Sequence, residues 1–372
     1  MPNGTAYVMD VGSSTITLWH SSNFGATWDP LTYLPGVSSF ARARFATDKV
    51  GYLTDYSALY TTTDGATTAT SWKRLPGPRM AKGDSFGLWE LGVTGSTVSV
   101  GGEVSGPPHV GCNPPKHSDI WTSHDSGRTW VDARLPGYVG IGSIRFANAR
   151  DGVALAWEFK PDGNPCEYLG STNSVYVTHD GGRHFVRAAH CAAHAGELCT
   201  AAMFLDSHRL LVGRNDGTMT SSADGGRTFT ERPGLPTIIG MQPTKAEQDD
   251  WFWIQGFAQA GGTLYATTKF AGAYLSTNSG QTWTRETTCD STYTLGIGEV
   301  AAFDGTRAIA GGPTCLSTRL ATPVGAPATA PVTGSAPTGP DTVASAYGLT
   351  ASVTAGRVVI VRSLRPAASR AG

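Results

Sequence analysis

One short turn motif recurs along the chain and limits its fold more than any other feature of the sequence. The motif reads Ser or Thr, any residue, Asp or Asn, any residue, Gly, any residue, Thr, aromatic residue. Five copies follow this frame, with His184 as the one exception at the seventh place. A further copy is degenerate, and its aromatic residue arrives late, as Trp72. The copies are marked by their Asx residues, which are Asn23, Asp64, Asp125, Asp180, Asp224 and Asn278.

The residue types of this motif suit a tight turn between two strands. An Asx side chain accepts hydrogen bonds from nearby backbone N–H groups, and Gly adopts positive φ without strain. The hydroxyl of the first residue satisfies another local polar group, and the closing aromatic residue buries a large apolar face against the sheet. We therefore interpret the six Asx residues as structural, and not as catalytic acids or calcium ligands.

The spacing of the turns predicts the fold. Successive Asx markers are 41 to 61 residues apart, and a four-stranded propeller blade needs about 40–50 residues. Each interval is therefore one blade plus a variable loop. In one interval the strands are expected at residues 143–148, 152–157, 174–178 and 185–188. Beyond Asn278, strands at residues 299–303, 306–310 and 315–318 predict a further blade. The predicted fold is all-β, a single β-propeller of four-stranded blades, with seven blades, or six if residues from 316 onward form no blade.

The repeated motif resembles the Asp-box, or bacterial neuraminidase repeat, of sialidase-like and photosystem II assembly factor-like propellers. Its copies and their flanking strands cover most of residues 5–318, and five good copies make the match specific. The resemblance implies the propeller architecture, but it does not extend to the sialidase site. The Phe/Tyr-Arg-Ile-Pro segment of sialidases is absent, the early arginines of residues 40–45 do not match it, and no nucleophilic Tyr with a Glu partner is assigned. In the members of this group that are not enzymes, the same repeat belongs to a propeller that binds a partner.

The two ends of the chain are expected to close the ring. The first blade starts at its second strand, residues 5–9, which leaves its innermost place empty. Residues 357–362 fill either that place or the outer place of the last blade, and strands from both termini would remove open sheet edges. We expect one propeller over residues 1–365, a flexible Pro/Ala/Thr/Gly-rich loop at 321–340 within the closing blade, and a disordered tail at 366–372.

Composition and charge exclude several classes of partner. Charged residues make up 15% of the chain, against a usual value of about 25%, and 47 residues are Gly, as expected for short strands and tight turns. The net charge is −1 and no basic run is present, so nucleic acid is not an expected partner. No apolar stretch approaches the about 18 residues that span a bilayer. We expect a monomer without a cofactor.

The six cysteines form an even set, which permits a disulfide framework. Disulfides indicate an oxidising compartment, although the sequence shown contains no signal peptide. We expect an extracellular or cell-envelope location. Cys191 and Cys199 would close one link between blades. The other expected pairs are Cys112 with Cys166 and Cys289 with Cys315. A metal site at Cys191, Cys199 and the neighbouring histidines is the less favoured alternative, because structural zinc sites usually have two well-separated ligand pairs.

Loop lengths indicate which face of the propeller is functional. The copies of the motif, which we call box turns, join third to fourth strands. They therefore share a face of the propeller with the turns that join first to second strands. The longest loops, at residues 101–118, 158–173, 188–200 and 231–250, lie on the opposite face. Long loops on a rigid scaffold commonly carry function, so we expect this loop-rich face to bind the ligand.

Acidic and aromatic residues on that face are the candidate site residues. Glycoside hydrolysis needs two carboxylates about 5–5.5 Å apart for retention or about 6.5–9.5 Å for inversion. The acids nearest to strand ends or loops are Glu90, Glu103, Glu158 and Glu299, and each is more easily explained as a solvated loop residue. Candidate binding residues are Trp157, Asp249, Asp250, Trp251 and Trp253; Trp89 and Phe257 are further aromatic candidates that also suit packing between blades. The expected function is non-catalytic binding of a protein or glycan by a secreted or envelope-associated propeller. The alternative is a sialidase-like glycoside hydrolase.

Overall fold

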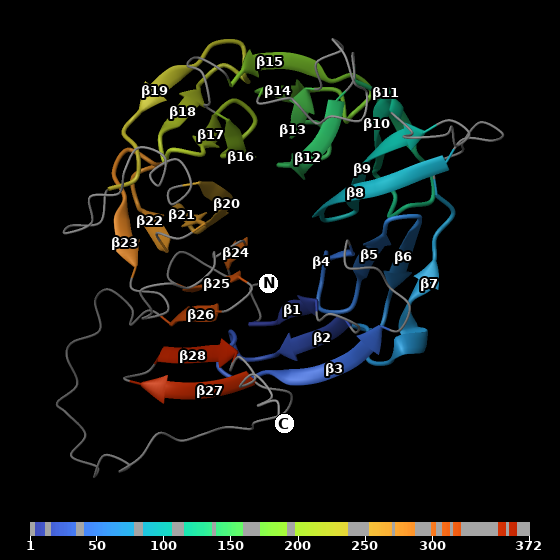
Figure 1. Ribbon diagram of the computed structural model, residues 1–372, viewed down its shortest axis with the longest axis vertical. Helices are drawn as coiled ribbons and strands as arrows, with labels where there is room; N and C mark the ends of the chain where they lie inside the picture. The colour runs from blue at the N-terminus through green and yellow to red at the C-terminus, as the bar shows by residue number, and fades with distance from the viewer. Residues whose placement is uncertain are drawn as a thin grey trace, which may run out of the picture. The chain divides into compact units, whose positions relative to one another are not determined.

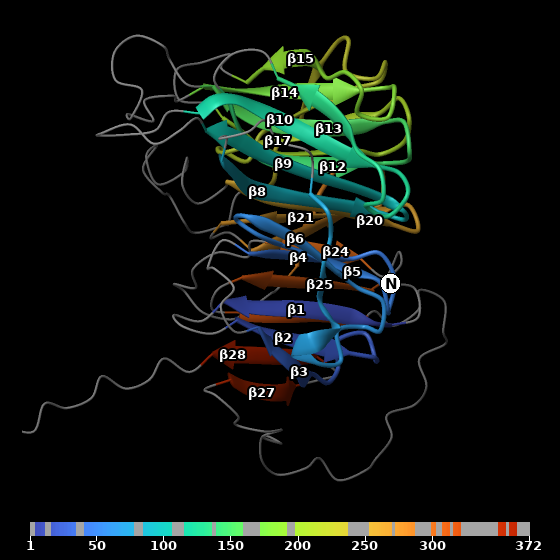
Figure 2. The same cartoon turned by 90° about the vertical axis from the view of Figure 1, so that its right-hand side faces the viewer.

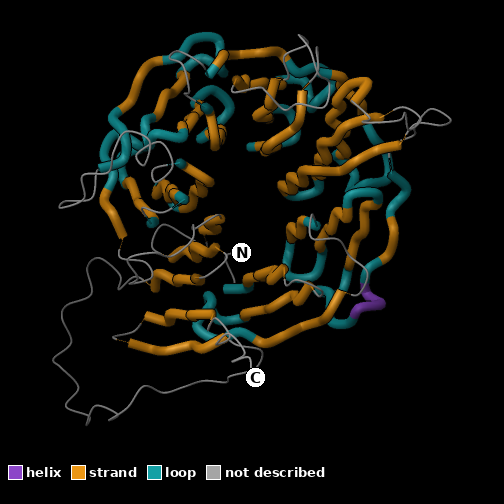
Figure 3. Tube along the Cα trace, viewed as in Figure 1, coloured by secondary structure: helices purple, strands orange, loops and turns teal. Residues whose placement is uncertain are grey.

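The computed structural model describes residues 4–11, 16–34, 41–77, 85–105, 115–135, 139–158, 172–191, 198–236, 253–269, 272–286, 299–302, 307–312, 315–320, 349–354 and 357–362. Contacts divide the chain into two compact units. The larger unit is Tyr7–His20 with Asp29–Gly234, and the smaller unit is Met1–Ala6, Ser21–Trp28 and Leu235–Gly372. Strands dominate both units, and η1 (Ala69–Ser71) is the one short helix among the described residues (Figure 3).

The larger unit contains five sheets whose strands follow one another in chain order. The first has three strands: β1 (Ala6–Val11), β2 (Ile16–Ser21) and β3 (Asp29–Leu34). The second has β4 (Arg42–Phe45), β5 (Gly51–Asp55), β6 (Ala58–Thr62) and β7 (Lys73–Arg74). The third has β8 (Ser85–Thr94), β9 (Thr97–Ser105), β10 (Pro115–Ser123) and β11 (Val131–Arg134). The fourth has β12 (Val139–Phe146), β13 (Gly152–Glu158), β14 (Thr172–Thr178) and β15 (Val186–His190). The fifth has β16 (Cys199–Phe204), β17 (Leu210–Arg214), β18 (Met219–Ser222) and β19 (Thr230–Arg232).

The smaller unit contains two sheets. One has β20 (Ile254–Ala260), β21 (Thr263–Thr268), β22 (Ala273–Ser276) and β23 (Thr284–Glu286). The other has the order β24-β25-β26-β28-β27. Its strands are β24 (Glu299–Ala302), β25 (Arg307–Gly312), β26 (Cys315–Leu320), β27 (Leu349–Thr354) and β28 (Arg357–Arg362).

The predicted strands are confirmed, with boundaries that differ by a few residues. The C-terminal strand β28 pairs with β26, which is the outer place of the last sheet, one of its two predicted positions. The strand β27 was not predicted; it extends that sheet beyond β28. Six sheets contain at least four strands and thus a complete blade, and the first contains three. Seven blades and the closure of the ring therefore stay predictions. The loop at 321–340 and the tail at 366–372 lie outside the described residues.

Within the larger unit, the first strands of the third, fourth and fifth sheets pack against the preceding sheet. Contacts join β8 to β4 and β5, β12 to β8 and β9, and β16 to β12 and β13. Figure 1 shows β4, β8, β12 and β16 along the inner edge of this unit. The perpendicular view of Figure 2 shows β8, β9 and β10 running side by side across the picture. Apolar residues fill the spaces between sheets, as where Leu155 of β13 packs in one cluster with Phe204 and Leu210 of the fifth sheet. This is the packing of propeller blades.

The six box turns share one local geometry. The hydroxyl of the first residue donates to the Asx Oδ1 atom over 2.7–3.0 Å. It also accepts the N–H of the fifth residue over 2.7–3.1 Å. In the five regular copies the Asx Oδ1 accepts the N–H of the seventh residue over 2.8–3.0 Å. The fourth and fifth residues of every copy have φ between 58° and 92°, which explains the Gly at the fifth place.

In four sheets the box turn contacts the first-to-second turn of its own sheet. The N–H of Gly181, for example, donates to the carbonyl of Arg150 over 3.0 Å, and Gly225 donates to His208 over 2.7 Å. The two kinds of turn therefore lie at the same edge of a sheet, as predicted. Consecutive box turns are also linked, because His179 Nε2 lies 2.9 Å from the carbonyl oxygen of Gly225 in the next sheet.

Candidate functional site

A disulfide joins two consecutive sheets of the larger unit at the end opposite to the box turns. We call this end the loop-rich edge, because it belongs to the predicted loop-rich face. Cys191 follows β15 and Cys199 begins β16, with Cα atoms 5.3 Å apart. Both residues are buried, and the predicted pair is confirmed. Cys112, Cys166 and Cys289 lie outside the described residues, and only the backbone of Cys315 is described, in β26. Their predicted pairs stay predictions.

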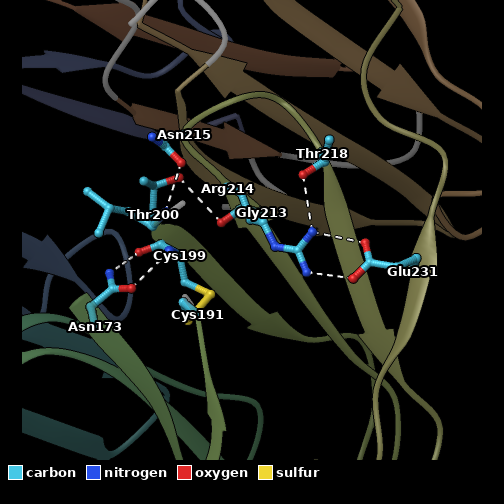
Figure 4. The surroundings of a disulfide bond; sticks show 10 residues. Asn173, Cys191, Cys199, Thr200, Gly213, Arg214, Asn215, Thr218 and Glu231 are labelled. Carbon is cyan, nitrogen blue, oxygen red and sulfur yellow. Dashed lines mark hydrogen bonds and ion pairs between the residues drawn. A yellow bond between two sulfur atoms is a disulfide. The ribbon is translucent and has the colours of Figure 1, made fainter. Parts of the chain in front are cut away.

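Asn173 holds this disulfide from the adjacent sheet (Figure 4). Asn173 is the second residue of β14 and is buried. Its Oδ1 atom accepts the N–H of Cys199 over 2.9 Å, and its Nδ2 atom donates to the Cys199 carbonyl. Its own carbonyl accepts the N–H of Cys191 over 3.0 Å. One side chain and one carbonyl thus hold both cysteines in place.

A second asparagine holds the end of the same link. Asn215 Oδ1 accepts the N–H of Leu198 over 2.8 Å, and the N–H of Asn215 donates to the Leu198 carbonyl over 3.0 Å. The next residue, Asp216, accepts the backbone N–H of Thr218 over 2.9 Å and closes the turn between β17 and β18. The link therefore ends on a rigid turn of the fifth sheet.

An ion pair lies beside this turn (Figure 4). The Arg214 guanidinium contacts Glu231 through two parallel hydrogen bonds of 2.9 and 2.7 Å. The Arg214 side chain is 10% exposed, whereas that of Glu231 is 68% exposed. Because the carboxylate faces solvent, the pair contributes about 1 kcal/mol or less to stability. Its main effect is to orient the guanidinium between β17 and β19.

The hydrogen bonds from Asn173 and Asn215 that hold the Cys191–Cys199 link form what we call the clamp. Trp157, a predicted binding residue, lies close to it. It pairs with Asn173 across β13 and β14 and with Gly140 across β12 and β13. The register of β12 and β13 shifts between Ile141 and Ser143, so Gly142 is a bulge on the innermost strand. A Cβ atom on Gly142 would lie 2.6 Å from Trp157 Nε1. The indole therefore lies directly against the glycine backbone.

The four candidate acids lie in three different sheets. Glu158 ends β13 and Glu299 begins β24 in the smaller unit. Glu90 and Glu103 lie on the paired strands β8 and β9, where Glu90 is opposite Gly101, two residues before Glu103. Such diagonal positions are about 7–8 Å apart. Both residues are half-buried.

The prediction that Glu90 lies near a strand end is wrong. It lies in the middle of β8, which runs from Ser85 to Thr94. The predicted loop at 101–118 is also shorter, because β9 continues to Ser105 and β10 begins at Pro115. Gly101 and Gly102 lie in this extended part of β9, although Gly is more common in turns. Here the missing side chain of Gly101 admits Ile141 of the next sheet, whose Cγ2 would lie 2.6 Å from a Cβ.

The remaining aromatic candidates have different surroundings. Trp253 is half-buried, and Lys269 Nζ lies 5.6 Å from the centre of its ring. Phe257 is 1% exposed and belongs to the core. The side chain of Trp89 lies outside the described part of β8, and Asp249, Asp250 and Trp251 lie outside the described residues.

Sequence reasoning missed the polar residues that build the clamp, because asparagines 173 and 215 belong to no motif. It also missed a buried acid on the third sheet. Asp119 is 3% exposed and lies 2.9 Å from His117 Nδ1 and 3.4 Å from Arg134 Nε. Burial and the charge of Asp119 together raise the pKa of the neighbouring Asp132. No group of three or more His, Cys, Asp or Glu residues suited to a metal ion occurs in the described part of the chain.

The lowered carboxyl pKa values of the box turns have a structural cause. Hydrogen bonds from the turn hold the pKa of Asp125 and Asp224 well below the usual range, chiefly those from Thr129 and Thr228. Burial opposes the shift at Asp180, but hydrogen bonds from His184 and Thr178 lower its pKa to about 2. A carboxyl group with a shifted pKa can mark a functional site. At these positions the hydrogen bonds of the turn explain the shift.

The comparisons with known proteins agree with the β-propeller class that the sheets define. The WD40 beta propeller domain of Doa1 is similar, with a TM-score of 0.52 and 10% identity over 82% of this chain and 85% of that one. The computationally designed Ika8 protein is similar with a TM-score of 0.50 and 12% identity over 97% of this chain and 95% of the other. YCF48 from Cyanidioschyzon merolae has a TM-score of 0.48 and 11% identity over 83% of this chain and 93% of its own. At 10% identity the similarity to the Doa1 domain shows the fold alone, which is a β-propeller.

No protein-family model matches the chain, and no curated protein matches it. Among the residues that the structure describes, no helix is long and apolar enough to cross a membrane.

Proposed function

We propose that the chain is a non-catalytic propeller of the Asp-box group that binds a protein or glycan through its loop-rich edge. The clamp around the Cys191–Cys199 disulfide carries this proposal. Asn173 and Asn215 hold the link between two sheets from both sides, and such preorganisation lowers the entropy lost on binding. A disulfide and two buried amide clamps at one edge suit a surface that must keep its shape when a ligand binds.

The proposed location is extracellular or in the cell envelope, because a buried disulfide suits an oxidising compartment. The proposed domain is a single monomeric propeller over residues 1–365. The proposed contact residues are Trp157, Trp253, Asp249, Asp250 and Trp251. No nucleic acid and no cofactor are part of this proposal.

The alternative, a glycoside hydrolase, has one specific observation in its favour. Glu90 and Glu103 occupy diagonal positions on paired strands, beside a register shift between Leu88 and Glu90. Residues at such positions are about 7–8 Å apart, so one substrate could contact both carboxylates. A hydrolase would lose nearly all turnover without its general acid or base, since such groups supply factors of about 10²–10⁴.

Two assays on the purified full chain separate the two functions. We expect no hydrolysis of aryl sialosides or other aryl glycosides by the wild type. We also expect saturable binding on an array of immobilised glycans and secreted-protein ectodomains. Glu90→Gln, Glu103→Gln, Glu158→Gln and Glu299→Gln should each change that binding by no more than about tenfold. Turnover that Glu90→Gln or Glu103→Gln abolishes while circular dichroism stays unchanged would establish the hydrolase instead.

A further inference from the structure

Trp157 is an aromatic residue that does not belong to the apolar core cluster beside it. Along β13, Val153 and Leu155 are buried in the cluster between the fourth and fifth sheets. Trp157 follows at the same spacing, so it continues their face of the strand. It is only half-buried, and it is absent from the described residues of that cluster and from those packed against it. Along β13 the buried residues of this cluster end at Leu155, and Trp157 follows near the end of the strand.

The glycine backbone beside the indole leaves room for the pyrrole edge of the ring. Gly142 is the bulged residue of β12, and it remains exposed. A Cβ atom there would lie 2.6 Å from Trp157 Nε1 and 3.2 Å from Cδ1. Bulges occur next to functional sites, where they redirect side chains, and a glycine within a strand often marks close approach by a ligand. An exposed glycine that supports an indole combines both features.

We propose that Trp157 and Gly142 form a stacking platform for one hexopyranose ring of a glycan. This inference rests on the proposed binding function and names the ligand class of that edge. The indole offers an apolar face, and its Nε1–H makes no hydrogen bond to a described residue. A pyranose is complementary, because its ring C–H groups form an apolar face and its hydroxyls surround the rim. Binding sites generally combine an apolar lining with a few placed polar groups.

The size and rigidity of the platform favour a sugar over a protein. Among the described residues, one indole beside one glycine covers a single sugar ring, whereas a specific protein interface buries about 1,000 Å² or more in total. The backbone that carries the indole is held in place, because Trp157 pairs with Asn173, whose side chain is hydrogen-bonded to Cys199 of the next sheet. A fixed aromatic surface loses little conformational entropy when a ligand stacks on it.

The test uses the β-1,4-linked tetrasaccharides of glucose, mannose and galactose as probes with the full chain. Saturation-transfer NMR should show contact concentrated on ring C–H protons of at least one probe, and calorimetry should give its affinity. Trp157→Ala should weaken that affinity about tenfold or more, as for an anchoring Trp. Gly142→Ala should weaken it too, because its Cβ displaces the indole. Trp157→Phe should retain part of the affinity.

Two matched variants serve as controls. Gly77→Ala adds a Cβ that meets nothing within 4 Å, and Val186→Ala trims a side chain that is 65% exposed; both should bind as the wild type does. Unfolding by urea would confirm that all variants are folded. The inference is overturned if no probe binds the wild type, or if Trp157→Ala binds equally well. In the second case the glycan-binding function would stand with a different contact surface, whereas hydrolysis of a probe would overturn the proposed function itself.

Discussion

Asn173 pairs with both backbone groups of Cys199, a residue that lies in the next sheet. Its own carbonyl also accepts the N–H of Cys191, so one residue of β14 holds the two ends of the disulfide-closed link. Asn173 is buried, with 1% of its surface exposed. Loss of its side chain would therefore leave a buried N–H and a buried carbonyl of Cys199 without their partner.

We predict that Asn173→Ala lowers the free energy of unfolding by about 2–4 kcal/mol, because each buried unsatisfied group costs about 1–3 kcal/mol. Asn173→Asp should cost at least as much, because an ionised carboxylate would be buried and one of its oxygens would face the Cys199 carbonyl oxygen, even though the other could still accept the Cys199 N–H. Urea unfolding followed by tryptophan fluorescence measures both. An Ala variant as stable as the wild type would contradict the role of these two hydrogen bonds.

The disulfide itself is expected to stabilise the fold. The cysteines are 8 residues apart in sequence, and closing a loop of that size contributes about 2.5 kcal/mol in the chain-entropy model. The double variant Cys191→Ser with Cys199→Ser should unfold at a correspondingly lower urea concentration. Its midpoint should not change further on adding a thiol reductant if this bond is the only one that the reductant reaches. Equal midpoints for the wild type and the double variant would argue against the bond.

The box aspartates should make stability depend on pH in the acid range. The folded-state pKa of Asp224 is lowered by hydrogen bonds from Thr228 and Ser222. Its stabilising contribution is therefore complete above the unfolded pKa, near 4, and is lost as the pH falls through the lower folded value. Two natural turns use Asn at this place, and there Nδ2 donates to the Thr hydroxyl over 2.9 and 2.8 Å. Asp224→Asn should consequently keep the turn and flatten the loss of stability between about pH 5 and pH 2.

Urea midpoints measured at pH 7, 5, 4 and 3 check this prediction. The exposed Asp29 lies outside the box turns, so Asp29→Asn is the matched control for the loss of one carboxylate. A pH dependence unchanged by Asp224→Asn would show that the turn carboxylate does not contribute.

The close approach of the third and fourth sheets depends on a glycine. A Cβ atom on Gly92 would lie 2.6 Å from the backbone oxygen of Ile144, and a backbone atom cannot move aside as a flexible side chain does. We predict that Gly92→Ala costs about 1–3 kcal/mol through overpacking. Gly77→Ala, with open space around the new methyl group, should stay within about 0.5 kcal/mol. Thermal unfolding would measure both, and equal effects at the two positions would refute the packing argument.

The sequence alone was sufficient to predict the repeat, the turns and the strand order. The box motif determines its own conformation, because its hydroxyl, its Asx side chain and its Gly interact only within eight consecutive residues. The spacing of Asn23, Asp125 and Asp224 then predicts blades, since each blade is a local meander of neighbouring strands. The Cys191–Cys199 pair was predictable for the same reason, because both residues bracket one short link.

Only the tertiary structure decided what lies between the sheets. The bonds from Asn173 to Cys199 span 26 residues, and no local pattern marks an asparagine that caps a neighbouring sheet. The strand character of Glu90 and Gly101 depended on packing against the fourth sheet, which overrides the tendency of glycine to form loops. The placement of Trp157 against Gly142 followed from a one-residue register shift. Such a shift arises from the pairing of whole strands, which side-chain periodicity within one strand does not encode.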